Sequence, residues 1–128
     1  MIQRANRYLV IRRAAKVIAP GRLCFPGGGI EPGESEQQTL IREMEEELGV
    51  VAEPVERIWE SVTPWEVEIA WWSAKLEPAA RLHPNPEEVA AVYWLTPEEL
   101  QHRAELLESN REFLAYLKGV ERGQSEAR

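Results

Sequence analysis

Residues 42–49 read Arg-Glu-Met-Glu-Glu-Glu-Leu-Gly, and this short segment is the most informative part of the sequence. Three of its acidic residues, Glu43, Glu46 and Glu47, are spaced i, i+3 and i+4, so a helix would place their carboxylates on one face. Like charges at this spacing destabilise a helix slightly. Arg42 is the one cationic side chain in the predicted helix. The segment is therefore poorly suited to serve only as a stable surface helix.

Two interpretations of the acidic cluster follow from the residues alone. One is a solvated acidic face, and the other is a site for a divalent cation, because Mg²⁺ and Mn²⁺ prefer carboxylate, water and phosphate oxygens. Arg42 lies one turn before Glu46 and could orient that carboxylate. Upstream, Gly27, Gly28 and Gly29 form either an ordinary turn or a place where backbone and carbonyl oxygens approach a ligand closely.

The boundaries of the predicted helix are marked by capping residues. Ser35, followed three residues later by Gln38, predicts a capping box, and Gly49 predicts the end of the helix. Two later helices are predicted to begin at Thr96 and Ser109. Runs of apolar and β-branched residues predict strands over residues 7–12, 55–59, 67–72 and 89–95. Strands mixed with helices through short connections predict an α/β sandwich.

Length and charge limit the classes of function. The 128 residues predict a single domain, and a hydrophobic share of 44% with a charged share of 29% is typical of a globular protein. The net charge of −7 disfavours a nucleic-acid polymer as partner, because such a polymer requires a basic surface. A small phosphorylated ligand is compatible with this charge, since a bound cation supplies positive charge locally.

Compartment and chain ends are predicted from simple features. No apolar run is long enough to span a membrane, and the N-terminus has no apolar stretch of signal-peptide length. The single cysteine, Cys24, excludes an internal disulfide and is typical of a reducing cytoplasm; packing is the more common role for such a residue than nucleophilic attack. The tail, residues 119–128, is predicted to be flexible.

The spacing of the motif resembles a known family. Gly28 is followed after five residues by Glu34, and after seven more by Arg42 and the segment that ends at Val50. This pattern resembles the Nudix box, with every defining position filled. The resemblance implies an α/β/α sandwich around a mixed β-sheet, and hydrolysis of a diphosphate bond in a nucleoside diphosphate-linked substrate. It extends to two flanking segments, Phe25-Pro26-Gly27-Gly28 and Tyr93-Trp94-Leu95.

The resemblance also implies roles for individual residues. Glu43, Glu46 and Glu47, with the carbonyl oxygen of Gly27, would bind one to three cations, Mg²⁺ or Mn²⁺. Three residues would be structural or orienting, namely Gly28, Glu34 and Arg42.

The proton acceptor in such a reaction is left open among three carboxylates. Glu46 and Glu43 belong to the box, whereas Glu88 stands six residues before Trp94, where many members of the family place a further carboxylate. For Glu88 the alternative is an exposed acidic residue beside Glu87.

Substrate residues are implied by a resemblance to the mutator-type nucleoside triphosphate pyrophosphohydrolases. In that comparison Arg13 contacts phosphate, Phe25 lines the pocket of the base, and Asn110 reads a purine edge. The alternative for Asn110 is a helix cap together with Ser109.

The substrate favoured by this comparison is a ribo- or deoxyribonucleoside triphosphate, which gives a nucleoside monophosphate and pyrophosphate. Trp65 or Trp71 could stack on the base. The alternatives are a nucleotide sugar such as ADP-ribose, a Nudix-fold module that binds a nucleotide without cleaving it, or an acidic interaction helix that binds no metal.

One feature departs from the pattern of the family. Nudix domains usually begin with a strand that precedes the strand predicted at Tyr8, and here the chain begins so close to Tyr8 that the first strand is predicted to be truncated. An exposed sheet edge invites pairing with another chain, so low stability or a homodimer is expected. A stable monomer without an added strand would contradict this expectation.

Overall fold

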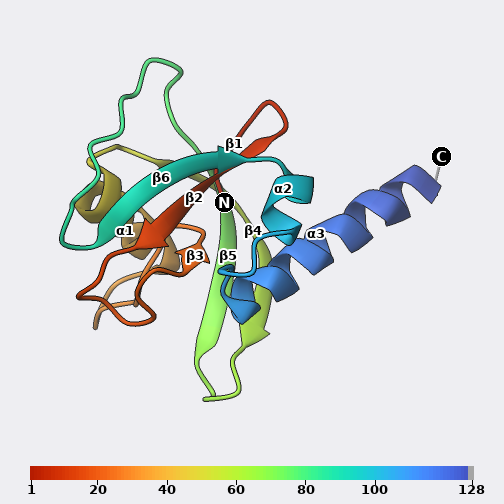
Figure 1. Cartoon of the computed structure of the whole chain (residues 1–128), viewed down its shortest axis with the longest axis horizontal. Coiled ribbons are helices and arrows are strands. Elements are labelled where there is room, and N and C mark those ends of the chain that lie inside the picture. Colours follow the sequence, from red (N-terminus) through yellow and green to blue (C-terminus); the bar gives the residue numbers. More distant parts are fainter. Residues whose placement is uncertain (127–128) are drawn as a thin grey trace.

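The computed structural model describes the backbone of residues 1–126 and the side chains of residues 1–120. Three strands precede the first helix, three more strands follow it, and two helices come last in the described part of the chain (Figure 1). In order they are β1 (Gln3–Arg4), β2 (Arg7–Arg13), β3 (Leu23–Cys24), α1 (Glu36–Leu48), β4 (Glu53–Val62), β5 (Glu68–Lys75), β6 (Val89–Leu95), α2 (Pro97–Gln101) and α3 (Glu108–Glu126).

The sheet is built around β2, which pairs antiparallel with β1, β3 and β6. A hairpin of β4 and β5 forms a second unit. A parallel bridge between Ile2 and Ala74 joins the two units, with hydrogen bonds of 2.9 Å from Ala74 N to Met1 O and from Leu9 N to Ile2 O. The described strand pairs are all antiparallel, so the mixed character predicted for the sheet comes from this parallel bridge, and the first strand is short.

Helices cover both faces of the sheet, which confirms the α/β/α sandwich. Successive residues of a strand point to opposite faces. Accordingly, Leu9 and Ile11 of β2 pack in one core cluster with Met44 and Leu48 of α1. The intervening strand residues pack in a second cluster with α2 and α3, whose largest fully buried side chain is Phe113. The site described below lies where these two layers meet.

The predicted caps of α1 are confirmed. Ser35 is the N-cap, its side chain accepts a hydrogen bond from Gln38 N, and the Gln38 side chain bonds back to Ser35 N. Gly49 ends the helix with a φ of 62°, a left-handed conformation that glycine adopts without a steric penalty. Thr96 likewise caps α2. These ends are determined by neighbouring residues, which is why the sequence predicts them well.

Other boundaries differ from the predictions. The short strand β3 was not expected, because its pairing with β2 depends on the tertiary fold. Helix α3 begins at Glu108, so the prediction that Ser109 caps it is wrong. The helix continues to Glu126, so residues 119–126 of the predicted tail are helical. Flexibility of this tail stays a prediction, and residues 127–128 lie outside the described part of the chain.

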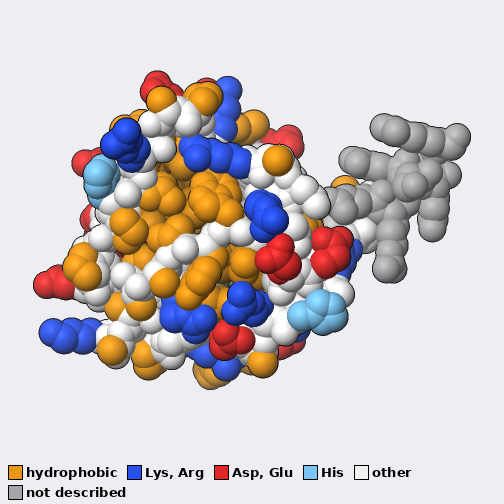
Figure 2. All heavy atoms as spheres, turned by 45° about the horizontal axis from the view of Figure 1, so that its top comes forward, with side chains coloured by type: hydrophobic (Ala, Val, Ile, Leu, Met, Phe, Trp, Pro, Cys, Tyr) orange, Lys and Arg blue, Asp and Glu red, His pale blue; other side chains and the backbone are white. Residues whose placement is uncertain are grey.

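Hydrophobic side chains gather on one face of the molecule, with Lys and Arg side chains around them (Figure 2). An apolar surface of this kind is compatible with the expected homodimer, which stays a prediction. Within the described residues, no helix combines the length and the apolar character needed to cross a membrane.

Candidate active site

The three glutamates of α1 differ in their surroundings. Glu47 lies on the buried face beside Leu48, and 6% of its surface is exposed. The side chain of Glu43, one turn earlier, is 13% exposed, whereas that of Glu46 is 47% exposed. Helix geometry therefore brings Glu43 and Glu47 towards the protein interior and leaves Glu46 at the margin of the site.

Glu47 is a buried carboxylate with little compensating charge. It accepts a hydrogen bond of 2.9 Å from the backbone N–H of Gly27. Burial, then the nearby charges of Glu43 and Glu88, raise the pKa of Glu47 to about 8, whereas the Gly27 hydrogen bond and, less strongly, the charge of Arg13 oppose this shift. A group held in this way binds a proton or a cation readily at neutral pH.

Glu43 occupies the space above Gly28. A Cβ atom added to Gly28 would overlap the Glu43 carboxylate, so any larger residue here would displace that side chain. Burial raises the pKa of Glu43 even though its Oε1 lies 2.8 Å from an Arg42 nitrogen. Gly28 thus allows this carboxylate to lie against the backbone of the turn.

Glu88 joins the two helix carboxylates from a distant part of the sequence. Its charge contributes to the raised pKa values of Glu43 and Glu47, which places it close to both. The loop before β6 is held by a hydrogen bond of 2.8 Å from Asn85 N to the backbone oxygen of Glu47. The Oε2 atom of Glu88 is buried and has no hydrogen-bond partner among the described residues. Such an atom is costly unless a ligand satisfies it.

Arg42 is the common partner of the surrounding acids. Its guanidinium donates to both oxygens of Glu34 at 2.7 and 2.9 Å, and to the backbone oxygen of Gly29 at 2.9 Å. It also bonds Glu43 at 2.8 Å and Glu46 at 3.1 Å. Arg42 therefore ties the glycine turn to the helix and orients two of the predicted cation ligands.

Glu34 differs from these carboxylates in being fully satisfied. Besides the two bonds from Arg42, it accepts one from Glu31 N at 3.0 Å and one from the Thr39 hydroxyl at 2.7 Å. These bonds, the Arg42 bond first, lower the pKa of Glu34 to about 2. Its geometry is that of a structural anchor of the turn.

The donor set suits a hard cation, although it is not preassembled. Among the side chains of residues 1–120, no three His, Cys, Asp or Glu residues converge closely enough to hold a metal ion as they stand. Glu43 and Glu46 turn instead towards Arg42. The buried Glu88 oxygen without a partner and the raised pKa values of Glu43 and Glu47 indicate a lack of positive charge. Carboxylate oxygens are the protein ligands that Mg²⁺ and Mn²⁺ prefer.

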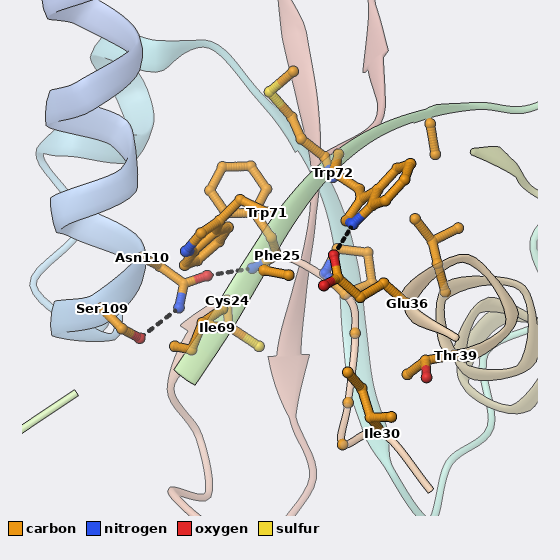
Figure 3. A pocket seen from close by; sticks show the side chains of 18 of the residues that line it. Cys24, Phe25, Ile30, Glu36, Thr39, Ile69, Trp71, Trp72, Ser109 and Asn110 are labelled. Carbon is orange, nitrogen blue, oxygen red and sulfur yellow. Dashed lines mark hydrogen bonds between the residues drawn. The ribbon is translucent and has the colours of Figure 1, made fainter. Parts of the chain in front are cut away.

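A cavity of about 390 Å³ opens next to the glycine turn (Figure 3). Its walls come from β3, the turn, α1, β5 and the start of α3. All three predicted substrate residues line it, namely Arg13, Phe25 and Asn110. The Phe25 ring is packed edge-on against Trp71 and Phe113, with centroids 6.2 and 5.5 Å away, so it forms a rigid part of the wall.

Asn110 is buried and has a structural partner. Its Oδ1 accepts a hydrogen bond of 2.8 Å from Phe25 N, and its Nδ2 donates to the Ser109 hydroxyl at 3.1 Å. One lone pair of Oδ1 and one hydrogen of Nδ2 are therefore already bonded within the protein. As α3 begins at Glu108, Asn110 is also not a helix cap.

The tryptophans divide between the surface and the cavity. Trp65, at the tip of the β4–β5 hairpin, is 82% exposed and does not line the cavity. Trp71 does line it, stacked on Phe113 at 4.2 Å. Two residues that the sequence did not single out, Glu36 and Trp72, line it as well and are joined by a hydrogen bond of 2.7 Å. Their place in the cavity wall becomes visible only in the folded chain, where the start of α1 lies against β5.

Comparisons with known proteins agree with this geometry. A family model described as the NUDIX domain matches residues 1–117. The chain is 33% identical over 107 residues to CTP pyrophosphohydrolase of Escherichia coli strain K12, a match that covers 77% of this chain and 73% of that protein. It is 34% identical over 108 residues to Nudix hydrolase 3 of Caenorhabditis elegans, with 75% of this chain covered but only 43% of the longer worm protein.

A solved structure shows the same fold. The MutT protein from Methanosarcina mazei Go1 superimposes with a TM-score of 0.76 at 20% identity, over 90% of this chain and 85% of that one. The likeness to this structure concerns the fold, whereas the family match spans the motif, the glycine turn and the loop of Glu88 together. This chain therefore belongs to the Nudix hydrolase family.

Proposed function

We propose that this chain hydrolyses a nucleoside triphosphate to a nucleoside monophosphate and pyrophosphate in a reaction that depends on Mg²⁺ or Mn²⁺. The observation that supports the proposal most strongly is the group of carboxylates of Glu43, Glu47 and Glu88, of which Glu47 is buried and the other two are half-buried, beside a glycine turn that lines a largely apolar cavity. The phosphates would lie at the carboxylates, and the nucleoside would occupy the cavity.

Four groups would hold the cation: the side chains of Glu43, Glu46 and Glu47, and the backbone oxygen of Gly27. When bound, the cation neutralises phosphate oxygens and lowers the pKa of the attacking water. Arg42 keeps Glu43 and Glu46 within reach of this position through its own hydrogen bonds. Its bidentate bond with Glu34 holds the guanidinium in a defined orientation.

The attacking water must lose a proton, and three carboxylates are candidates to accept it. Glu88 is favoured over Glu43 and Glu46, because its Oε2 is buried near the site and not committed to a protein donor. A carboxylate in hydrogen-bond reach of the water acts as a general base. The substitution then forms the new P–O bond as the bond to the pyrophosphate oxygen breaks.

The choice of a triphosphate is supported by the similarity to CTP pyrophosphohydrolase, which this chain matches over most of its length. A nucleotide sugar stays the alternative substrate. In the same site, its diphosphate would meet the same carboxylates.

The test is a panel of nucleoside and deoxynucleoside triphosphates together with ADP-ribose, each with Mg²⁺ or Mn²⁺ and with a chelator. We expect release of pyrophosphate from triphosphates, no reaction with the chelator, and a fall of about a thousandfold or more for Glu46→Gln. Glu45→Gln, on the exposed side of the same helix, is the matched control. Hydrolysis of ADP-ribose alone would select the alternative substrate, and binding without hydrolysis would indicate a non-catalytic module.

A further inference from the structure

Glu36, the first residue of α1, is held in place by two donors from the β4–β5 hairpin. The indole Nε1 of Trp72 donates to its Oε1 at 2.7 Å, and Nε of Arg57 donates to the same oxygen at 2.9 Å. Both partners therefore bond to a single oxygen of the carboxylate. This arrangement fixes the side chain and uses neither donor on the other oxygen, Oε2.

The side chains of Glu36 and Trp72 belong to the wall of the cavity (Figure 3). The Glu36 side chain is 32% exposed, and among the described residues no donor bonds to its Oε2. The Trp72 hydrogen bond, and after it the Arg57 bond, lower the pKa of Glu36, so the group is ionised at neutral pH. An ionised carboxylate accepts hydrogen bonds and donates none.

The other polar side chains around the cavity are largely committed to the protein. Asn110 bonds Phe25 N and Ser109, and the Thr39 hydroxyl donates to Glu34. Arg13 donates to the backbone oxygen of Ile18 at 2.6 Å. Glu68, the second acid in the wall, is exposed at the start of β5. Glu36 thus presents a fixed acceptor in a cavity whose remaining walls are mostly apolar.

We propose that Glu36 is a specificity-determining residue that accepts a hydrogen bond from the amino group of a nucleobase. This inference rests on the proposed function, since it assigns the nucleoside to the cavity. Cytosine presents an amino group where uracil presents a carbonyl oxygen, and adenine differs from hypoxanthine in the same way. A carbonyl oxygen placed opposite the carboxylate leaves two acceptors without a donor, which disfavours that base.

Glu36→Gln tests this role because it replaces one hydrogen-bond acceptor of the side chain by a donor. The amide oxygen must still accept from Trp72 and Arg57, so the NH₂ group takes the position of Oε2. The variant then offers a donor to the base, and its preference should move towards uracil and hypoxanthine. Because both protein hydrogen bonds survive, the link between α1 and the hairpin is retained.

Two measurements are made on the full chain for the matched pairs CTP/UTP and ATP/ITP. The first is kcat/KM for hydrolysis, and the second is the affinity for the corresponding monophosphates by calorimetry. We expect the native chain to favour the amino-bearing member by about tenfold or more, and Glu36→Gln to remove or reverse that preference. Glu45→Gln should retain the native ratio. Trp72→Phe, which removes one of the two donors that fix Glu36, should narrow the ratio without reversing it.

The outcomes separate this inference from the proposed function. Base preference in monophosphate binding supports it even if no triphosphate is hydrolysed, in which case the proposed function alone fails. If Glu36→Gln lowered kcat/KM and affinity equally for both members of each pair, Glu36 would have only a structural role, and the inference would be overturned. A ratio unchanged in both Glu36→Gln and Trp72→Phe would overturn it as well.

Discussion

Glu34 and Glu47 lie 13 residues apart in the same motif, yet their environments are opposite. Glu34 accepts bonds from Arg42, Thr39 and the backbone of Glu31, and its pKa is lowered to about 2. Glu47 is buried near other acids, and its pKa is raised to about 8. The protein therefore supplies Glu34 with a cationic partner and several hydrogen-bond donors, whereas Glu47 receives very little compensating positive charge.

The difference separates two tasks within one motif. The Glu34–Arg42 pair keeps the glycine turn attached to the helix, a task complete within the protein. Glu47, with Glu43 and Glu88, is left with a charge deficit that a ligand can fill. Perturbed carboxylates of this kind concentrate at functional sites.

The largest expected effect is on catalysis. Glu47→Gln should lower kcat by about a thousandfold or more, because it removes a proposed cation ligand while its amide oxygen still accepts from Gly27 N. Glu34→Gln should lower kcat by less than about tenfold, since Arg42 keeps its bonds with Glu43 and Glu46. Steady-state kinetics of both variants check this prediction. Equal losses of kcat in the two variants would show that anchoring the turn and binding the cation are not separate tasks.

The next effect concerns stability without metal. The folded-state pKa of Glu47 is raised, so its contribution to stability is fully present below about pH 4.5 and is lost as the pH rises towards 8. Glu47→Gln does not ionise and should therefore increase the free energy of unfolding by about 2 to 4 kcal/mol at pH 8, with little change at pH 4.5. Denaturant titrations in the presence of a chelator measure it. A gain of the same size at both pH values would mean that Glu47 is not the titrating group.

The smallest effect tests the glycine turn. Gly28→Ala should displace the Glu43 carboxylate and lower kcat/KM by about tenfold, with little loss of stability because the displaced atoms end a flexible side chain. Gly29→Ala is the matched comparison, since an added Cβ meets nothing within 4 Å there, and it should lower kcat/KM less. Kinetics and thermal unfolding of the two variants decide the point. A similar loss of kcat/KM in both variants would indicate that the turn needs the backbone flexibility of glycine at both positions.

Much of the fold could be predicted because its signals are local. The capping box at Ser35, the end of α1 at Gly49, and the start of α2 after Thr96 all appear where the sequence places them. The apolar runs that became β2 and β6 were also recognised. Strand β3 was missed, since two residues become a strand only when β2 lies beside them.

The site was predictable only in part. The acidic pattern identified Glu43, Glu46 and Glu47 as a group, but it treated the three as equivalent, whereas the structure buries Glu47 and exposes Glu46. The hydrogen bond between Glu36 and Trp72 had no signal at all, because 36 residues separate the two positions.

Local sequence was enough to define a helix with known ends, an acidic pattern and one arginine, because capping and helical spacing depend on residues within a few positions. The folded chain was needed to show which carboxylates are buried, which lie near Glu88, and which form hydrogen bonds with Arg42. Desolvation and charge act through space, so they depend on segments that come together only when the chain folds.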